Sequence, residues 1–103
     1  MAGQRRQIVW APKATQDLTD VWHYYARVAS PDVADKLLRE IDEAAKRLAA
    51  EATVWRSRDD IMPGLRAVRV SPYLIFYRVR NDTAEVVRVL HERRNLHQIL
   101  ARR

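Results

Sequence analysis

The sequence predicts an α+β fold: a first strand, a helical hairpin, then a three-stranded antiparallel sheet, with a short C-terminal helix as a candidate last element. Residues 12–51 repeat apolar side chains at helical spacing, whereas residues 65–91 carry three stretches rich in β-branched and aromatic residues. A chain of 103 residues supports one modest core. We therefore expect residues 1–103 to form a single domain.

The first half opens with "RQIVW" (6–10), a β-branched and aromatic stretch that ends before Pro12 and predicts a short strand. Pro12 suits the first turn of a helix, and an apolar stripe extends this helix to about Val28. Ser30 and Pro31 then have the residue types of an N-cap and a first helical position. The short connection predicts an antiparallel helical hairpin.

The second half begins after a stretch without periodicity, about residues 52–63, which predicts a loop closed by a Pro63-Gly64 turn. Three strands are expected over Leu65–Val70, Tyr73–Arg80 and Ala84–His91, joined by hairpins at "SP" and "NDT". In "RNLHQILARR", apolar residues return at helical spacing and indicate a last short helix.

Composition excludes several classes of function. The chain has no cysteine, and its three histidines lack the short spacing of a zinc site, so we expect no metal and no cofactor. No apolar run approaches the roughly 20 residues that cross a bilayer, and the first residues lack the apolar core of a signal peptide. We expect a cytoplasmic protein with no membrane partner.

The positive charge lies in the second half of the chain. The formal net charge is +6, and residues 61–103, with nine arginines and three acids, account for all of it. Such asymmetry favours an anionic partner, either nucleic acid or an acidic protein segment, although solubility alone is an alternative explanation. The preference for arginine over lysine is typical of bidentate recognition, but a GC-rich coding bias would produce it too.

Strand alternation predicts which arginines share a face. Tyr73, Ile75, Tyr77 and Val79 form one set with Val68, Val70 and Arg66, and in the last strand Val87, Val89 and His91 oppose Val86, Arg88 and Leu90. This alternation puts Arg69, Arg78 and Arg88 together on the face opposite the helices. We expect the C-terminal segment and an acidic, partly apolar peptide to cover that face. Alternatively, the arginines lay their methylenes on the sheet and keep their guanidiniums in water.

The order of these elements, together with particular words, resembles the ParE branch of the RelE/ParE toxin superfamily of plasmid-stabilisation type II toxin–antitoxin modules. The words are "APKATQDLTDVWHYYA", "MPGLRAVRVSPYLIFYRV" and "VVRVLHERRNL". The resemblance implies a ParD-like antitoxin that wraps the toxin with a C-terminal segment disordered until it binds. It also implies inhibition of DNA gyrase by the free toxin, and contact with operator DNA only through the antitoxin.

The RelE branch, which cuts mRNA on the ribosome, is the alternative that the resemblance leaves open. Arg66, Arg69, Arg78 and His91 could imitate its catalytic set. His91 is expected on the opposite face from Arg69 and Arg78, and we interpret it as orienting Arg93 or Arg94. We therefore expect no catalytic residue and a non-enzymatic inhibitor. A plain basic nucleic-acid-binding domain is a further alternative.

The residues expected to contact the antitoxin or the target are Arg66, Arg69, Arg78, Arg88, His91, Arg93 and Arg94. Two features depart from the family pattern. Ala11 stands where a serine or threonine often caps the first helix, and "EATVW" lacks the proline and glycine common before "SRDD".

Overall fold

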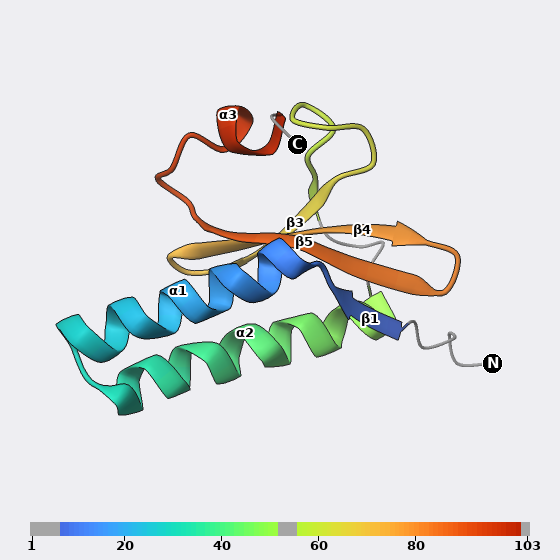
Figure 1. The fold of residues 1–103 in the computed structure, drawn as a ribbon. Coiled ribbons are helices and arrows are strands. Elements are labelled where there is room, and N and C mark those ends of the chain that lie inside the picture. The colour runs from blue at the N-terminus through green and yellow to red at the C-terminus, as the bar shows by residue number, and fades with distance from the viewer. Residues whose placement is uncertain (1–6, 52–55, 102–103) are drawn as a thin grey trace.

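The computed structural model describes residues 7–51 and 56–101, without the side chains of residues 49–51 and 101. The predicted strand residue Arg6, loop residues 52–55 and the final Arg102 and Arg103 lie outside this description. In chain order the elements are β1 (Gln7–Trp10), α1 (Pro12–Val28), α2 (Pro31–Glu51), β2 (Arg56–Ser57), β3 (Arg66–Val70), β4 (Tyr73–Arg80), β5 (Thr83–His91) and α3 (Leu96–Ala101) (Figure 1).

The described strands form one sheet in the order β1-β5-β4-β3-β2. β1 pairs with β5 in parallel, and the other neighbouring strands are antiparallel. The predicted α+β class and element order are confirmed, but the sheet has β1 and β2 at its edges in addition to the predicted meander. Residues 56–57 were predicted as loop. A two-residue strand is too short to show the alternation by which a strand is predicted from sequence.

The helical hairpin forms as predicted, and α1 and α2 lie side by side on one face of the sheet (Figure 1). Ser30 Oγ accepts a hydrogen bond from the Val33 N–H at 3.1 Å, as an N-cap does. α1 starts at Pro12 with Ala11 before it, and no side chain caps this end. Trp22 Nε1 on α1 donates to Asp35 Oδ1 on α2 at 2.8 Å and ties the two helices together.

Two apolar clusters lie on opposite faces of the sheet. The helix-side cluster packs α1 and α2 on residues that include Val68, Tyr73, Ile75, Tyr77, Ala84, Val86 and Val89. The far-side cluster joins Leu65, Ala67, Phe76, Val87 and Leu90 to Leu100 of α3. We call the sheet surface that carries this second cluster the far face. Figure 1 shows α3 and the loop after β2 on this face, away from the helical hairpin.

One irregularity in β5 reverses part of the predicted alternation. Phe76 pairs with Arg88 while Tyr77 pairs with Val86, so Val87 is an extra residue in β5. A bulge of this kind shifts the facing of the residues that precede it. The assignment of Val86 to the far face and Val87 to the helix side was therefore wrong, since Val86 lies in the helix-side cluster and Val87 in the far-side cluster.

The turns agree with their residue types. Leu65 N–H donates to the Met62 carbonyl at 3.0 Å across the predicted Pro63-Gly64 turn, and Gly64 has the positive φ of 78° that this turn requires. At the C-terminal end, Asn95 Oδ1 accepts the Gln98 N–H at 3.1 Å and caps α3, which confirms the predicted last helix.

Candidate partner-binding surface

The far face carries the three arginines that alternation placed there. In the strand register, Arg69 lies opposite Leu74 and Arg88 opposite Phe76, and both of these apolar residues pack in the far-side cluster. Arg78 lies opposite Glu85. Arg78 shares this face because its strand neighbours Tyr77 and Val79 belong to the helix side. Alternation thus places all three arginines on the far face, although Arg88 also reaches Asp17 of α1.

Each of these arginines has a carboxylate partner within the chain. Arg69 Nε lies 2.9 Å from Glu92 Oε1, and Arg78 Nη2 lies 3.2 Å from Glu85 Oε1. Arg88 is 2.8 Å from Asp17. An acidic partner would therefore meet guanidiniums that are already paired, and would have to compete with these carboxylates or add to them.

The Arg88 pair is the most enclosed of the three. Its two side chains are only 18% and 11% exposed, compared with 61% and 31% for Arg69 and Glu92. Arg88 Nε and Nη2 both donate to Asp17, whose Oδ2 also accepts the Val89 N–H at 2.9 Å. Hydrogen bonding to Asp17 raises the pKa of Arg88. This pair joins α1 to the edge of β5 and is part of the scaffold.

Sequence reasoning missed Asp17, which lies 71 residues before its partner. It stands off the apolar stripe of α1, where an acid ordinarily faces water. Only the parallel pairing of β1 with β5, which brings α1 alongside β5, makes this contact.

The other predicted site residues lie apart from the paired arginines. Arg66 pairs across the strands with Tyr77 and so belongs to the helix side. His91 pairs with Tyr73, and the two rings meet edge to face with centroids 5.4 Å apart. His91 Nδ1 accepts the Arg93 N–H at 3.1 Å, which holds the turn after β5. The structure therefore separates His91 from Arg69 and Arg78, and the main chain of Arg93, rather than its guanidinium, contacts the histidine.

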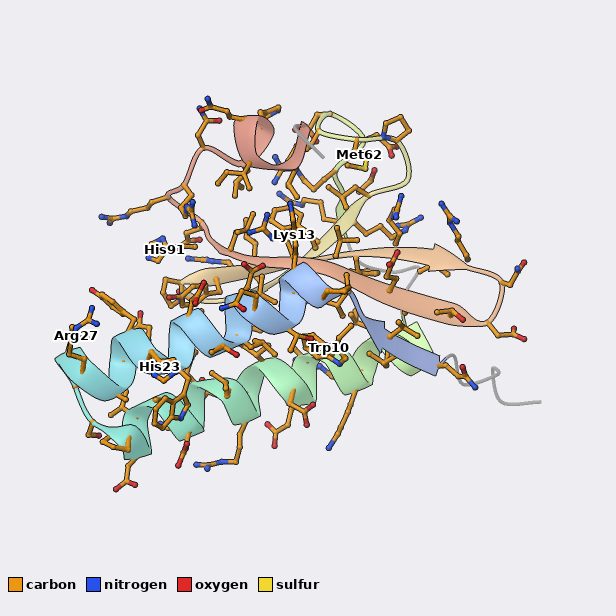
Figure 2. All side chains as sticks on the ribbon, in the orientation of Figure 1. Trp10, Lys13, His23, Arg27, Met62 and His91 are labelled. Atoms are coloured by element: carbon orange, nitrogen blue, oxygen red, sulfur yellow. The ribbon has the colours of Figure 1, made fainter. Side chains whose placement is uncertain are left out.

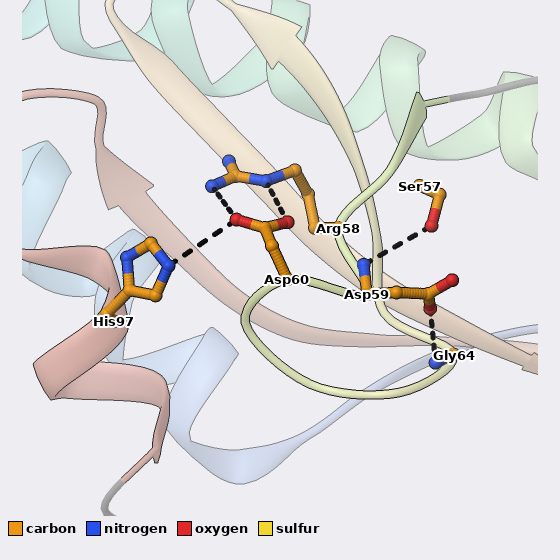
Figure 3. Close-up of polar contacts among 6 residues, drawn as sticks. All are labelled: Ser57, Arg58, Asp59, Asp60, Gly64 and His97. Carbon is orange, nitrogen blue, oxygen red and sulfur yellow. Dashed lines mark hydrogen bonds and ion pairs between the residues drawn. The ribbon is translucent and has the colours of Figure 1, made fainter.

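A polar network joins α3 to the loop that follows β2 (Figure 3). Arg58 binds Asp60 through two hydrogen bonds of 3.0 and 3.1 Å, and His97 Nε2 of α3 lies 3.4 Å from the same carboxylate. The hydrogen bond from Arg58 lowers the pKa of Asp60. Asp59 Oδ1 accepts the Gly64 N–H at 2.8 Å and closes the loop. Sequence reasoning did not single out these residues, although the "RDD" run beside a Pro-Gly turn is a local signal for such a loop.

Two hollows flank the covered part of the far face. One, of about 410 Å³, is lined by residues that include Arg56, Arg58, Arg69, Ala67 and Leu74. The other, of about 300 Å³, is lined by Val9, Arg78, Arg80, Asn81, Thr83 and Glu85. The side chains of Arg56 and Arg80 have no hydrogen-bond or ion-pair partner among the described residues. Both hollows combine guanidiniums with apolar surface, which suits a segment that is acidic and partly apolar.

Other site types are not found in the described part of the chain. Across residues 7–51 and 56–101, no group of three His, Asp or Glu side chains is arranged to hold a metal ion. In the same ranges, no helix is long and apolar enough to cross a membrane.

Comparisons with known proteins agree with this architecture. A sequence model described as "ParE toxin of type II toxin-antitoxin system, parDE" matches residues 8–96. Toxin ParE1 of Mycobacterium tuberculosis is 37% identical over 84 residues, which are 81% of this chain and 86% of the relative. Toxin ParE3 of Caulobacter vibrioides is 36% identical over 64 residues, 62% of this chain and 64% of that protein.

Solved structures show the same fold. A chain of the chromosomal ParDE toxin–antitoxin system from P. aeruginosa superposes with a TM-score of 0.76 at 24% identity, over 86% of this chain and 98% of its own. A chain of the RelBE2 toxin–antitoxin complex from Mycobacterium tuberculosis superposes with a TM-score of 0.59 at 18% identity, over 85% and 92% of the two chains. The sequence matches decide between these two branches: the chain belongs to the ParE toxin family of type II toxin–antitoxin systems.

Proposed function

We propose that this ParE-family toxin is neutralised in the cytoplasm by an acidic ParD-like antitoxin bound on the far face, and that the free toxin inhibits DNA gyrase without enzymatic chemistry. The observation that carries the binding part is the pair of hollows on the far face, in which arginines border apolar surface. The gyrase part is supported by family membership.

The far face supports an acidic partner because its charges are only partly compensated. Glu85 and Glu92 balance Arg78 and Arg69, but Arg56 and Arg80 border the same hollows without a described partner. Arg93 and Arg94, in the turn after β5, are also exposed, but Arg94 lines a separate hollow with residues of α1. A carboxylate-rich segment would pair with Arg56 and Arg80 while its apolar side chains fill the hollows.

This expectation also follows from what the related structures contain. One solved neighbour comes from a ParDE toxin–antitoxin system and the other from the RelBE2 toxin–antitoxin complex. By that likeness we propose that the partner is the antitoxin of the same module, and that operator DNA is contacted only through it.

The separation of the candidate catalytic groups supports a non-enzymatic action. Cleavage of RNA without a metal needs an acid, a base and a cation around one phosphate. His91 lies on the helix side of the sheet, whereas Arg69 and Arg78 are held in ion pairs on the far face. Burial raises the pKa of Tyr73 and of Tyr77, so both hydroxyls stay protonated near neutral pH and neither is available as a base.

Two assays on purified protein test this function. We expect supercoiling of plasmid DNA by gyrase to fall as toxin is added, and the mRNA in a translation extract to stay intact at the same toxin concentration. Addition of the antitoxin encoded by the neighbouring reading frame should restore supercoiling. Codon-positioned cleavage of mRNA that disappears in Arg78→Ala or His91→Ala would instead establish an endoribonuclease.

A growth experiment tests the module. Induction of the toxin alone should stop growth, and induction together with the neighbouring frame should not. The double variant Arg56→Gln with Arg80→Gln should weaken antitoxin binding by about tenfold or more, while Arg39→Gln with Arg47→Gln, exposed on the opposite side of the molecule on α2, should leave it unchanged. Equal affinities for the two double variants would remove the far face as the docking surface.

A further inference from the structure

A third hollow lies where the start of α1, the middle of β5 and α3 meet. Its volume is about 310 Å³. Its lining consists of Ala11, Pro12, Lys13, Glu85, Val87, Arg88, Ile99 and Leu100. Segments from three distant parts of the sequence build it, and a volume near 300 Å³ is at the lower end of the range for sites that bind small ligands or single anchoring side chains.

The hollow is mainly apolar, and buried side chains form part of its lining. Val87 is 4% exposed and Leu100 is 1% exposed, and both belong to the far-side cluster. An aliphatic group placed on them would bury further apolar surface, which is favourable by about 25 cal/mol for each Å² removed from water.

The charge around the hollow is dominated by one lysine. Glu85 is paired with Arg78 and Arg88 with Asp17, so these two lining residues are already compensated. Lys13 is exposed and has no partner among the described residues. Figure 2 shows its side chain pointing from the first turn of α1 toward the side of the sheet on which α3 lies. An occupant with a carboxylate next to an aliphatic group would meet both features.

We infer that this hollow receives an aliphatic side chain of an acidic peptide, and that a neighbouring carboxylate of the peptide pairs with Lys13 Nζ. The inference rests on the proposed function for the source of the peptide, which is the antitoxin. An acidic segment is favoured over a basic or neutral one because the chain has a formal net charge of +6 and Lys13 is the uncompensated charge at the rim.

The first test uses small probes with full-length protein and does not need the antitoxin. In ¹H–¹⁵N and methyl NMR spectra, hexanoate should shift the signals of Lys13, Val87 and Leu100 at millimolar concentration, because it combines the aliphatic chain with a carboxylate. Hexylamine and hexanol have the same chain with a cationic or neutral head and should shift them at least fivefold less. Equal shifts from the three probes, or none from hexanoate, would overturn the inference.

The second test uses matched lysine variants. Lys13→Gln removes the charge at nearly constant length, and Lys36→Gln makes the same change on the exposed side of α2. We expect Lys13→Gln to weaken binding of the antitoxin from the neighbouring frame by about five- to tenfold in calorimetry, and Lys36→Gln to leave it unchanged. Ile99→Trp, which narrows the hollow from its partly exposed wall, should weaken binding as well.

The outcomes separate this inference from the proposed function. If the antitoxin binds wild type, Lys13→Gln and Ile99→Trp equally, the hollow is not an anchor site, although the toxin–antitoxin pairing stands. If no antitoxin binds the wild type, the proposed function fails, and the hexanoate experiment still decides whether the hollow selects an aliphatic carboxylate. Circular dichroism and retained Val87 signals confirm that each variant is folded.

Discussion

The two faces of the sheet are built differently. The helix side is covered by the 17 residues of α1 and the 21 of α2, and its cluster holds the larger share of the buried apolar residues. The far side is covered by the six residues of α3 and a loop, and arginine–carboxylate pairs border its cluster. The difference indicates that the helix side supplies most of the stability of the fold, and the less covered far side is the one that we propose for a partner.

Removing a large side chain from the helix side should lower the free energy of unfolding more than any other change considered below. Ile41 is fully buried under the sheet, so we expect Ile41→Ala to lower the free energy of unfolding by about 2–5 kcal/mol. Val33→Ala, at a position that is 45% exposed, should change it by less than about 0.5 kcal/mol. Urea denaturation measures both, and similar values for the two variants would contradict a helix-side scaffold.

High pH should lower the free energy of unfolding through two tyrosines on the helix side. Burial raises the pKa of Tyr73 and Tyr77 in the folded state, so above the ordinary tyrosine pKa of about 10 the unfolded chain ionises first. The contribution of the two tyrosines to the free energy of unfolding is therefore fully present below pH 10. It is lost as pH rises above 10, by up to about 1.4 kcal/mol per pH unit for each tyrosine. Denaturation between pH 9 and 12 measures the slope, which Tyr73→Phe should reduce. If Tyr73→Phe left the slope unchanged, the pH dependence would not come from Tyr73.

The ion pairs of the far side should differ with their exposure. Asp17→Asn keeps an oxygen for the Val89 N–H but removes the charge opposite Arg88, and we expect it to destabilise the protein by about 2 kcal/mol. Glu92→Gln, in the more exposed pair with Arg69, should cost less than about 1 kcal/mol. Thermal or urea unfolding in low salt compares them. The reverse order would show that exposure does not govern these pairs.

Shortening the main anchor of α3 should loosen the far side alone. Leu100→Ala is expected to cost about 1–2 kcal/mol, less than Ile41→Ala, because a short helix can shift to fill the space. Hydrogen exchange should quicken in α3 while the amides of α2 and β4 stay protected. Faster exchange throughout the protein would mean that the two faces unfold as one unit.

The smallest effect is expected at the start of α1. Ala11 has extended backbone angles and offers no side-chain cap, so Ala11→Ser should raise the free energy of unfolding by about 0.5 kcal/mol. A melting-temperature shift measures this change. Ala29→Ser, just beyond the other end of α1, is the matched control and should bring no such gain.

The sequence predicted the local structure well because local chemistry decides it. Pro12, Ser30 and Pro31 mark the helix starts, Pro63-Gly64 marks a turn, and alternation gave the facing of every residue named in β3 and β4. The predicted contacts of Arg69, Arg78 and the other site residues with an antitoxin or a target remain predictions, since they depend on a second molecule.

What the amino-acid sequence determined by itself is the order of the elements, the helical hairpin and the gathering of Arg69, Arg78 and Arg88 on one face, because propensity and periodicity act between near neighbours. Tertiary structure alone decided the bulge at Val87, the short strand β2, and the carboxylate that each of these arginines meets. Asp17 and Arg88 show the reason. A contact between residues 71 positions apart depends on how α1 packs along β5, and no local pattern carries that information.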